Sequence, residues 1–238
     1  MLIGPYVNGI AIVIGGLAGA LMGTKMPERV RNALPQTFGL ASMGLGITLI
    51  IKVQYMPAVV LAMVLGAVLG ELLYIEKGIG HAAAKARHVI DNVLPASDGL
   101  PHKEFIDKFV AILVLFCASG TGIFGAMQEG MTGDPSVLYI KAILDLFTAA
   151  IFAATLGFAV ITIAIPQVLL QVGLAMLAIL ILPVVTQTMM DDFSAVGGFI
   201  MLATGLRICG IKIFPVANML PALVLIMPFS YLWVTFIG

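Results

Sequence analysis

Lys141 and Asp145 lie one helical turn apart at the start of the apolar stretch YIKAILDLFTAAIFAATLGF, residues 139–158. Residues four positions apart share one face of a helix, so these two side chains can form an ion pair. A charge in hydrocarbon costs roughly 2.5–3.5 kcal/mol on insertion scales, and such residues therefore face the protein interior or water. We expect Asp145 inside the membrane and Lys141 nearer the outer surface, which its side chain can reach.

The pair has two interpretations. It is either a salt bridge that locks this helix to its neighbours, or a site at which Asp145 binds a cation or proton on a transport path. In the second case Lys141 neutralises the carboxylate when the site is empty. Thr148 adds a hydroxyl on the next turn and favours the transport interpretation.

Further polar side chains inside apolar segments are candidates for the same path. Amides in membrane helices more often join helices than bind substrate. Prolines around PVANMLP at 215–221 remove helix hydrogen bonds, and freed carbonyls of broken helices coordinate ions in transporters. We expect an arginine in the seventh span to reach the cytoplasmic interface or to pair with a glutamate in the third. These candidates are Ser119, Thr121, Gln167, Gln171, Asn218, Arg207 and Glu71.

The sequence contains no recognisable catalytic pattern such as HExxH or a serine–histidine pair. His81, His88 and His102 all lie in one polar stretch without metal-ligand spacing. Cys117 and Cys209 each lie in an apolar run, and we expect buried thiols there rather than a disulfide or a metal ligand. We therefore expect a protein that is not an enzyme and has no cofactor or metal.

The composition is that of a polytopic membrane protein. Of the 238 residues, 61% are hydrophobic and 10% charged, and the mean hydropathy is +1.13. A soluble domain carries about 25% charged residues. The net charge of zero gives no reason to expect nucleic acid as a partner. The N-terminus lacks the basic region of a signal peptide, so the first apolar stretch is interpreted as a span.

The sequence predicts an all-α membrane protein, since a spanning helix needs about 20 mostly apolar residues. The first and the last two qualifying stretches are short or rich in Gly and Pro, which leaves seven spans as the alternative to eight. We interpret 1–238 as one membrane domain, with 76–105 as a cytoplasmic connector between the third and fourth helices. The predicted spans are 4–23, 35–52, 57–75, 106–127, 138–163, 166–186, 194–212 and 217–237.

Basic residues are unevenly distributed among the predicted loops. Lys25, Arg29 and Arg31 follow the first span, and further basic residues lie within 76–105 on the same side. The other side has Lys52 alone. The positive-inside rule then places the N- and C-termini outside the cytoplasm. The glycine-rich stretch 118–136 is expected to end the fourth span and turn outward as a flexible segment.

Two segments repeat one pattern. Residues 44–66 and 205–228 both begin Gly-Leu-x-Ile, pass through Ile-Lys and reach a proline. In the predicted topology the two copies have opposite orientations. Such inverted repeats are typical of secondary transporters, whose site lies at the repeat interface.

Glycines recur at four-residue spacing in two predicted spans. Small residues at this spacing allow helix backbones to approach closely in a membrane. The contacts lie either within one chain or between copies in a homo-oligomer. The glycines concerned are Gly15, Gly19, Gly23, Gly66 and Gly70.

Three stretches together resemble a known bacterial family. They are GGLAGALMGTKMPERVRNAL, LFCASGTGIFGAMQEGMTGDPSVLYIKAILDLFTAAIFAATLGF and SAVGGFIMLATGLRICGIKIFPVANMLPALV. The chain resembles the YqgA/YdfK-like multi-pass membrane proteins of unknown function, sometimes labelled a possible sodium channel or pump. The most specific parts are Gly-Asp at 133–134, Lys-x-x-x-Asp at 141–145 and VANMLP at 216–221. Ala142 and Leu146 depart from the family pattern and make this site less polar.

The sequence thus predicts a bacterial inner-membrane transporter or channel for a small ion or solute, with Asp145 as its coupling-ion or proton site. The expected partners are the lipid bilayer and the transported species. A membrane scaffold or sensor that moves nothing is the first alternative. A lipid-modifying enzyme is a weaker one, because no nucleophile or metal set is present.

Overall fold

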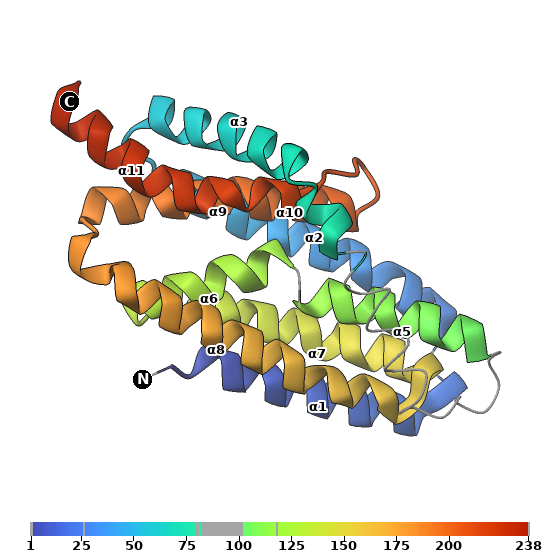
Figure 1. The fold of residues 1–238 in the computed structure, drawn as a ribbon. Coiled ribbons are helices and arrows are strands. Elements are labelled where there is room, and N and C mark those ends of the chain that lie inside the picture. Colours follow the sequence, from blue (N-terminus) through green and yellow to red (C-terminus); the bar gives the residue numbers. More distant parts are fainter. Residues whose placement is uncertain (1, 26, 80, 82–101, 118, 238) are drawn as a thin grey trace. The chain divides into compact units, whose positions relative to one another are not determined.

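The structure (Figure 1) is a computed structural model that describes residues 2–25, 27–79, 81, 102–117 and 119–237. These residues form helices joined by short connections and contain no strand. The prediction of an all-α membrane protein is therefore confirmed. The larger part of the predicted connector 76–105 lies outside the described residues.

The helices group into two compact units, each assembled from both halves of the sequence. Unit 1 comprises residues 1–35 and 77–176, and unit 2 comprises residues 36–76 and 177–238. Each unit is described by itself below.

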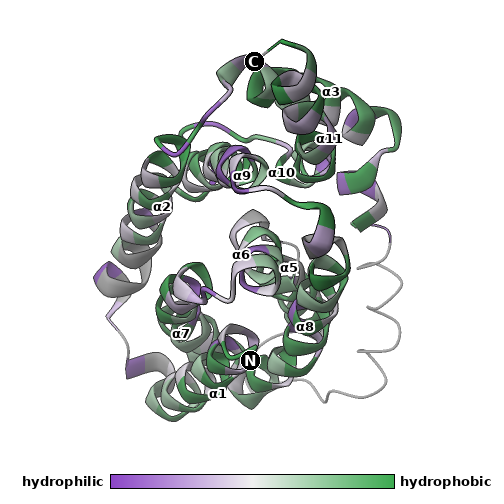
Figure 2. Ribbon diagram, turned by 90° about the vertical axis from the view of Figure 1, so that its left-hand side faces the viewer, coloured by the Kyte–Doolittle hydropathy of each residue, from purple (hydrophilic) through white to green (hydrophobic). Residues whose placement is uncertain are grey.

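Unit 1 contains the helices that carry most of the buried polar residues. They are α1 (Gly4–Met22), the short 3-10 helix η1 (Gly23–Lys25), α5 (His102–Cys117), α6 (Gly120–Thr132), α7 (Ser136–Leu156), the 3-10 helix η2 (Gly157–Ile163) and the main part of α8 (Ala164–Ile181). Figure 2, which looks along the helix axes, shows these helices around a common core.

Glycines bring α1 directly against α7. A Cβ added to Gly15 would lie 2.0 Å from the carbonyl oxygen of Leu146, and one on Gly19 would lie 2.0 Å from that of Ala150. The two helices run parallel, because Gly15 contacts Leu146 and Gly19, four residues later on α1, contacts Ala150, four residues later on α7. Gly23 plays no such part, since it ends α1 with φ +53 and has nothing within 4 Å of its Cβ position.

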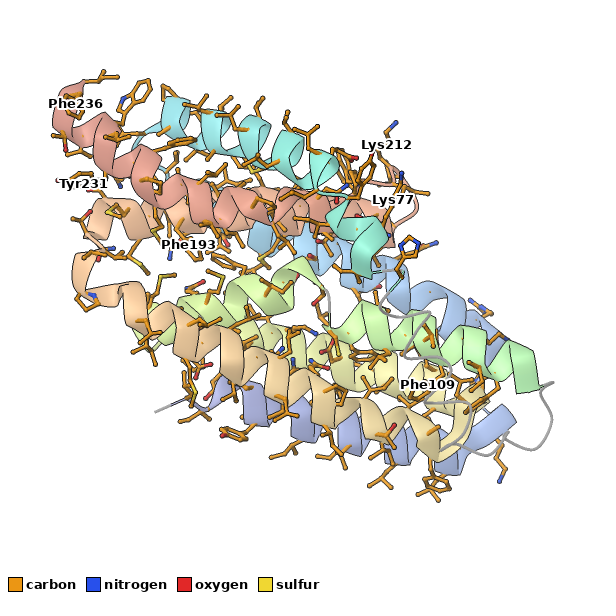
Figure 3. The ribbon with its side chains drawn as sticks, viewed as in Figure 1. Lys77, Phe109, Phe193, Lys212, Tyr231 and Phe236 are labelled. Carbon is orange, nitrogen blue, oxygen red and sulfur yellow. The ribbon has the colours of Figure 1, made fainter. Side chains whose placement is uncertain are left out.

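Unit 2 is built from two helical hairpins. It contains most of α2 (Glu28–Ile50), together with α3 (Met56–Leu72), the end of α8, η3 (Leu182–Val184), α9 (Gln187–Ile208), α10 (Val216–Met219) and α11 (Pro221–Phe236). Figure 3 shows Tyr231 and Phe236 toward the C-terminal end of α11, and both side chains are exposed.

The two hairpins of unit 2 have opposite orientations. Gly39 of α2 faces Gly205 of α9, and Gly46 of α2 faces Gly198 of α9, so these helices are antiparallel. A Cβ on any of the four would lie 2.5–2.8 Å from the carbonyl oxygen of its counterpart. Gly66 and Gly70 of α3 pack in the same antiparallel way. Their Cβ positions lie 2.5 Å from Ala222 N and 1.9 Å from Asn218 O. Both predicted repeat copies lie in this unit, in the inverted relation that the sequence suggested.

The stretch 118–136 differs from its prediction as a flexible outward turn. Residues 120–132 form α6, whose N-terminus is capped by the Ser119 hydroxyl, which accepts the N–H of Gly122 at 3.1 Å. Gly133 ends the helix with φ 73. The single predicted span 106–127 is thus two helices, with extended backbone at Ser119 between them (ψ 135).

The helix of the seventh predicted span, α9, begins earlier than predicted. Thr186 caps α9 by accepting the N–H of Met189, so the helix starts at Gln187 rather than near residue 194. Asp191 and Asp192 therefore lie in a helix and not in a loop.

Four stretches of the described residues are long and apolar enough to cross a membrane. The third covers both α7 and α8, and Gln36–Ile50 and Met56–Leu72 are shorter apolar helices. Green, apolar colouring predominates on the helices in Figure 2. The four stretches are Gly4–Met22, Lys108–Thr132, Ser136–Leu180 and Val216–Phe236.

Candidate functional site

The Lys141–Asp145 ion pair lies inside unit 1. Both residues are on α7, and the Lys141 ammonium donates to Asp145 Oδ2. Lys141 is 3% exposed and Asp145 8%. Asp145 is the tenth residue of α7, about 14 Å from its start at 1.5 Å per residue. The expectation that Lys141 extends to the membrane surface is wrong, because its side chain is held in the core by its partner.

Helix α8 supplies two amides to the same region. Gln167 Nε2 donates to Asp145 Oδ2 at 3.0 Å. Gln171 follows one turn later, with its Nε2 3.3 Å from the Cβ position of Gly122 on α6. Both glutamines are almost fully buried. The structure thus brings together four of the candidates from the sequence, on two helices.

The end of α5 and the start of α6 both contact the side chain of Lys141. Phe116, near the end of α5, places its ring centroid 5.7 Å from Lys141 Nζ, within the range of a cation–π interaction. In the first turn of α6, the Cβ position of Gly122 lies 2.7 Å from Lys141 Cε and 2.9 Å from Ser119 Oγ. Only glycine leaves room here for lysine, serine and glutamine to meet. Thr121, next to Gly122, is also buried.

Asn8 of α1 lies at the same position along the helix axes of unit 1 as the Lys141–Asp145 ion pair. Gly4 faces Leu138 and Gly15 faces Leu146, so Asn8 lies beside the part of α7 that carries the ion pair. The next residue, Gly9, faces Val168 on α8, one position from Gln167. We call Asn8, Ser119, Lys141, Asp145, Gln167 and Gln171 the polar cluster.

Several side-chain amide atoms of the polar cluster have no hydrogen-bond partner among the described residues. Both side-chain polar atoms of Asn8, both of Gln171 and Oε1 of Gln167 lack a hydrogen-bond partner within the described part of the chain. Leaving a buried donor or acceptor unpaired costs about 1–3 kcal/mol. Buried polar atoms in native proteins nearly always have a partner, either a protein group or an ordered water, and five atoms in this one region still need one.

A second carboxylate is buried nearer the C-terminal end of α6. Glu129 Oε1 accepts the N–H groups of Ile3 at 2.7 Å and Gly4 at 3.0 Å and so holds the start of α1. Glu129 Oε2 and Gln128 Oε1 have no partner among the residues described. They lie about 9–11 Å along α6 from Gly122 at 1.5 Å per residue.

An apolar cluster fills the other half of the unit 1 core. Phe116 and Ala149 lie at its border with the polar cluster. Phe109, labelled in Figure 3, belongs to this cluster. The polar half of the unit 1 core therefore lies toward the start of α1 and α7, and apolar side chains fill the opposite half. The cluster comprises Ile12, Phe105, Ile106, Phe109, Ile112, Phe116, Ala149, Ala153, Leu156, Val160, Ile163 and Ala164.

Three of the remaining candidates lie in unit 2. Asn218 Oδ1 accepts the N–H of Glu76 at 2.7 Å. Arg207 donates to Glu76 Oε1 at 2.7 Å and to the carbonyl of Phe214 at 3.0 Å. The predicted partner of Arg207, Glu71, is exposed instead, because Glu76, five residues further on, supplies the carboxylate.

Thr148 remains on α7 in unit 1 but does not join the polar cluster. Its hydroxyl donates to the carbonyl of Leu144 at 2.7 Å within its own helix. This is the ordinary way in which a threonine within a helix satisfies its hydroxyl.

Sequence reasoning missed a buried aspartate in unit 2. Asp192 Oδ1 accepts the N–H groups of Gln54 at 2.9 Å and Tyr55 at 3.0 Å, and Oδ2 accepts the hydroxyl of Ser230 at 2.7 Å. Asp192 is fully buried, while its neighbour Asp191 is only partly buried. The helical period around Phe193 could have distinguished the two aspartates, had the helix been predicted to start before residue 194.

Comparisons with known proteins agree with the resemblance seen in the sequence. Residues 3–231 match the family described as "Protein of unknown function (DUF554)". The chain is 57% identical over 234 residues to "Uncharacterized protein YqgA" of Escherichia coli (strain K12), covering 98% of each chain. It is 23% identical over 228 residues to "Uncharacterized membrane protein YdfK" of Bacillus subtilis (strain 168), covering 93% of each. No solved structure matches the chain.

Proposed function

The chain belongs to the DUF554 family of proteins of unknown function, and from the polar cluster we propose that it is a transporter or channel for a small ion or solute. Asp145 is the site of the coupling ion or proton, and Lys141 neutralises it when the site is empty. The protein is not an enzyme, in keeping with the absence of a catalytic pattern in its sequence.

The observation that carries the proposal is the composition of the polar cluster. A pair that served only to fix a helix would need no further polar groups, and an apolar core would stabilise the fold as well. Here the pair adjoins three buried amides with unpaired atoms. Ionisable groups inside membrane segments are functional sites by default because they are costly to keep there. The polar cluster thus has the groups to bind a small polar species.

The proposed orientation in the bacterial inner membrane places both termini outside the cytoplasm. It rests on the excess of Lys and Arg in 24–35 and 76–105. In unit 1 the start of α1 and Asp134 lie at one end, since α1 and α7 are parallel. The polar half of the core then lies toward the outside, and the apolar cluster separates it from the cytoplasm.

The test is current from proteoliposomes on a solid-supported membrane, with sodium, potassium, proton and anion gradients imposed in turn. The parent protein is expected to give a current or a pH change for at least one gradient. Asp145→Asn is expected to abolish it. So is the double variant Lys141→Met/Asp145→Asn, which leaves no unpaired charge in the core.

The matched control is Asp134→Asn, which removes an exposed carboxylate at the end of α6 and should leave the flux unchanged. Size-exclusion chromatography and thermal unfolding report whether each variant is folded. A folded double variant that retains full flux would contradict the assignment of Asp145. A parent protein silent for every gradient, by current and by internal pH, would favour the scaffold interpretation.

A further inference from the structure

Hydrogen-bond donors converge on the first turn of α6. An α-helix leaves its first N–H groups without partners inside the helix, and its N-terminus carries a partial positive charge. In the 13-residue α6, the Ser119 hydroxyl accepts the N–H of Gly122, so the serine's own O–H is free to donate to another group. The N–H of Thr121 has no partner inside the helix.

Two side chains from other helices point at this turn. Lys141 reaches the turn from α7, with its Cε 2.7 Å from the Cβ position of Gly122 and its ammonium group bonded to Asp145. Gln171 brings an amide from α8, 3.3 Å from the same position. Gln171 is 1% exposed and neither of its polar atoms has a partner among the described residues. A buried amide that faces a helix N-terminus without a partner indicates a place for a ligand.

The charges around the turn favour an anion over a metal cation. A cation bound to Asp145 would lie within a few ångströms of the Lys141 ammonium and near the positive end of α6. Two like charges so close together repel each other strongly inside a protein, where the effective dielectric constant is well below that of water. An anion would instead meet an ammonium group, a hydroxyl, an amide and backbone N–H groups, which together resemble the helix N-terminal sites that bind anions.

We propose that the first turn of α6, with Ser119, Lys141 and Gln171, is a binding site for a small monovalent anion. This inference rests on the proposed transport function and names the substrate class of the same site. The bound anion takes the place of Asp145 as the partner of Lys141.

Charge balance then requires a proton on Asp145. The charged or titratable groups described around it are Lys141 on α7 and the thiol of Cys117 on α5, while α1 and α8 present amides. When Lys141 turns to the anion, the carboxylate loses its counter-charge. One proton from the aqueous phase neutralises it, so that one anion and one proton enter together and the net charge of the site is unchanged.

Anion binding is measured on the purified full-length protein in detergent. The thermal unfolding midpoint is followed while sodium chloride or sodium methanesulfonate is added, with equal concentrations of sodium gluconate as the control for sodium and ionic strength. We expect a saturable rise with at least one small anion and none with bulky gluconate. An equal rise with all three salts, or no rise at all, would overturn the proposal.

Gln171→Met is the decisive variant. Because it removes two unpaired buried atoms, it should fold at least as stably as the parent while its apparent anion affinity falls about tenfold, the effect of losing one hydrogen bond. Gln128→Met is the matched control, since that amide is also buried with an unpaired oxygen but lies two turns away. Equal affinities in the two variants would contradict the site.

Ser119→Ala tests the hydroxyl independently. It should weaken anion binding several-fold, and Ser119→Thr, which keeps both the cap and the hydroxyl, should restore it. Unchanged binding in Ser119→Ala would argue against this turn as the site.

A transport measurement distinguishes failure of the anion site from failure of the proposed transport function. Proteoliposomes carrying a pH dye inside should acidify when chloride or methanesulfonate is added outside. Anion binding without any flux would refute transport and keep the site. Flux that follows a cation gradient, with no effect of anions on binding or transport, would keep transport and refute the anion site.

Discussion

At the scale of single residues, buried carboxylates in this protein hold helix ends together. Glu129 binds the N–H groups of Ile3 and Gly4 where α1 begins, and Asp192 binds those of Gln54 and Tyr55 just before α3. A carboxylate at a helix N-terminus satisfies N–H groups that have no partner inside the helix and also meets the positive end of the dipole. Asp145 is different, because its described partners are side chains. This difference is one reason to assign a function to Asp145 and a structural role to the other two.

Asp192→Ala is expected to lower the free energy of unfolding by about 2–4 kcal/mol. It leaves the N–H groups of Gln54 and Tyr55 and the hydroxyl of Ser230 without their acceptor, and charged hydrogen bonds are worth about 1.5–3 kcal/mol each. Asp191→Ala is the control and should cost less than about 1 kcal/mol, since its contacts are exposed. Thermal or denaturant unfolding in detergent gives both values. Equal losses would show that the buried hydrogen bonds of Asp192 do not govern stability.

At the scale of the helix, close packing depends on glycine in both units. The sequence predicted this role for Gly15 and Gly19 from spacing alone, because the four-residue period of small residues is a local property. It could not predict the partner, since α7 lies about 130 residues away and either a neighbouring copy or the same chain would satisfy the pattern. The break before α6 was also missed, because the apolar run from 106 to 127 conceals the cap at Ser119.

Gly15→Ala and Gly19→Ala should each destabilise the protein by about 1–3 kcal/mol, the usual cost of overpacking. The added Cβ would lie 2.0 Å from a carbonyl oxygen of α7 in both cases, so the two helices must separate. Gly173→Ala on α8 has nothing within 4 Å and should be neutral or stabilising by up to about 1 kcal/mol. Unfolding midpoints in detergent compare the three variants. A loss in Gly173→Ala equal to the other two would point to a general intolerance of alanine.

At the scale of the whole molecule, composition was sufficient to predict an all-α membrane protein. The eight predicted segments fall on helices of the structure, but their boundaries differ, and at α9 the reason is the Thr186 side chain, which caps the helix ahead of the predicted start. The polar cluster was predicted in part. Lys141, Asp145, Gln167, Gln171 and Asn8 are all polar residues in apolar runs of the sequence, but only the tertiary packing of α1 places Asn8 beside the other four.

The proposed orientation can be tested with single cysteines in a background in which Cys117 and Cys209 are replaced by Ala. Asp134→Cys should react with a membrane-impermeant maleimide in intact spheroplasts, because Asp134 lies at the end of unit 1 assigned to the outside. Lys25→Cys should react only after permeabilisation. The reverse pattern would place the termini in the cytoplasm, and reaction of both without permeabilisation would contradict the assignment of these two positions to opposite sides.

The parallel pairing of α1 with α7 has a consequence for how the protein is made. A ribosome adds about 5–20 residues per second, so α7 follows α1 into the membrane only after on the order of ten seconds. During that interval the glycine face of α1 has no permanent partner, and lipid or the insertion machinery must cover it. Nascent chains released before residue 150 would therefore carry an unassembled first helix, which makes them natural targets for membrane quality-control proteases.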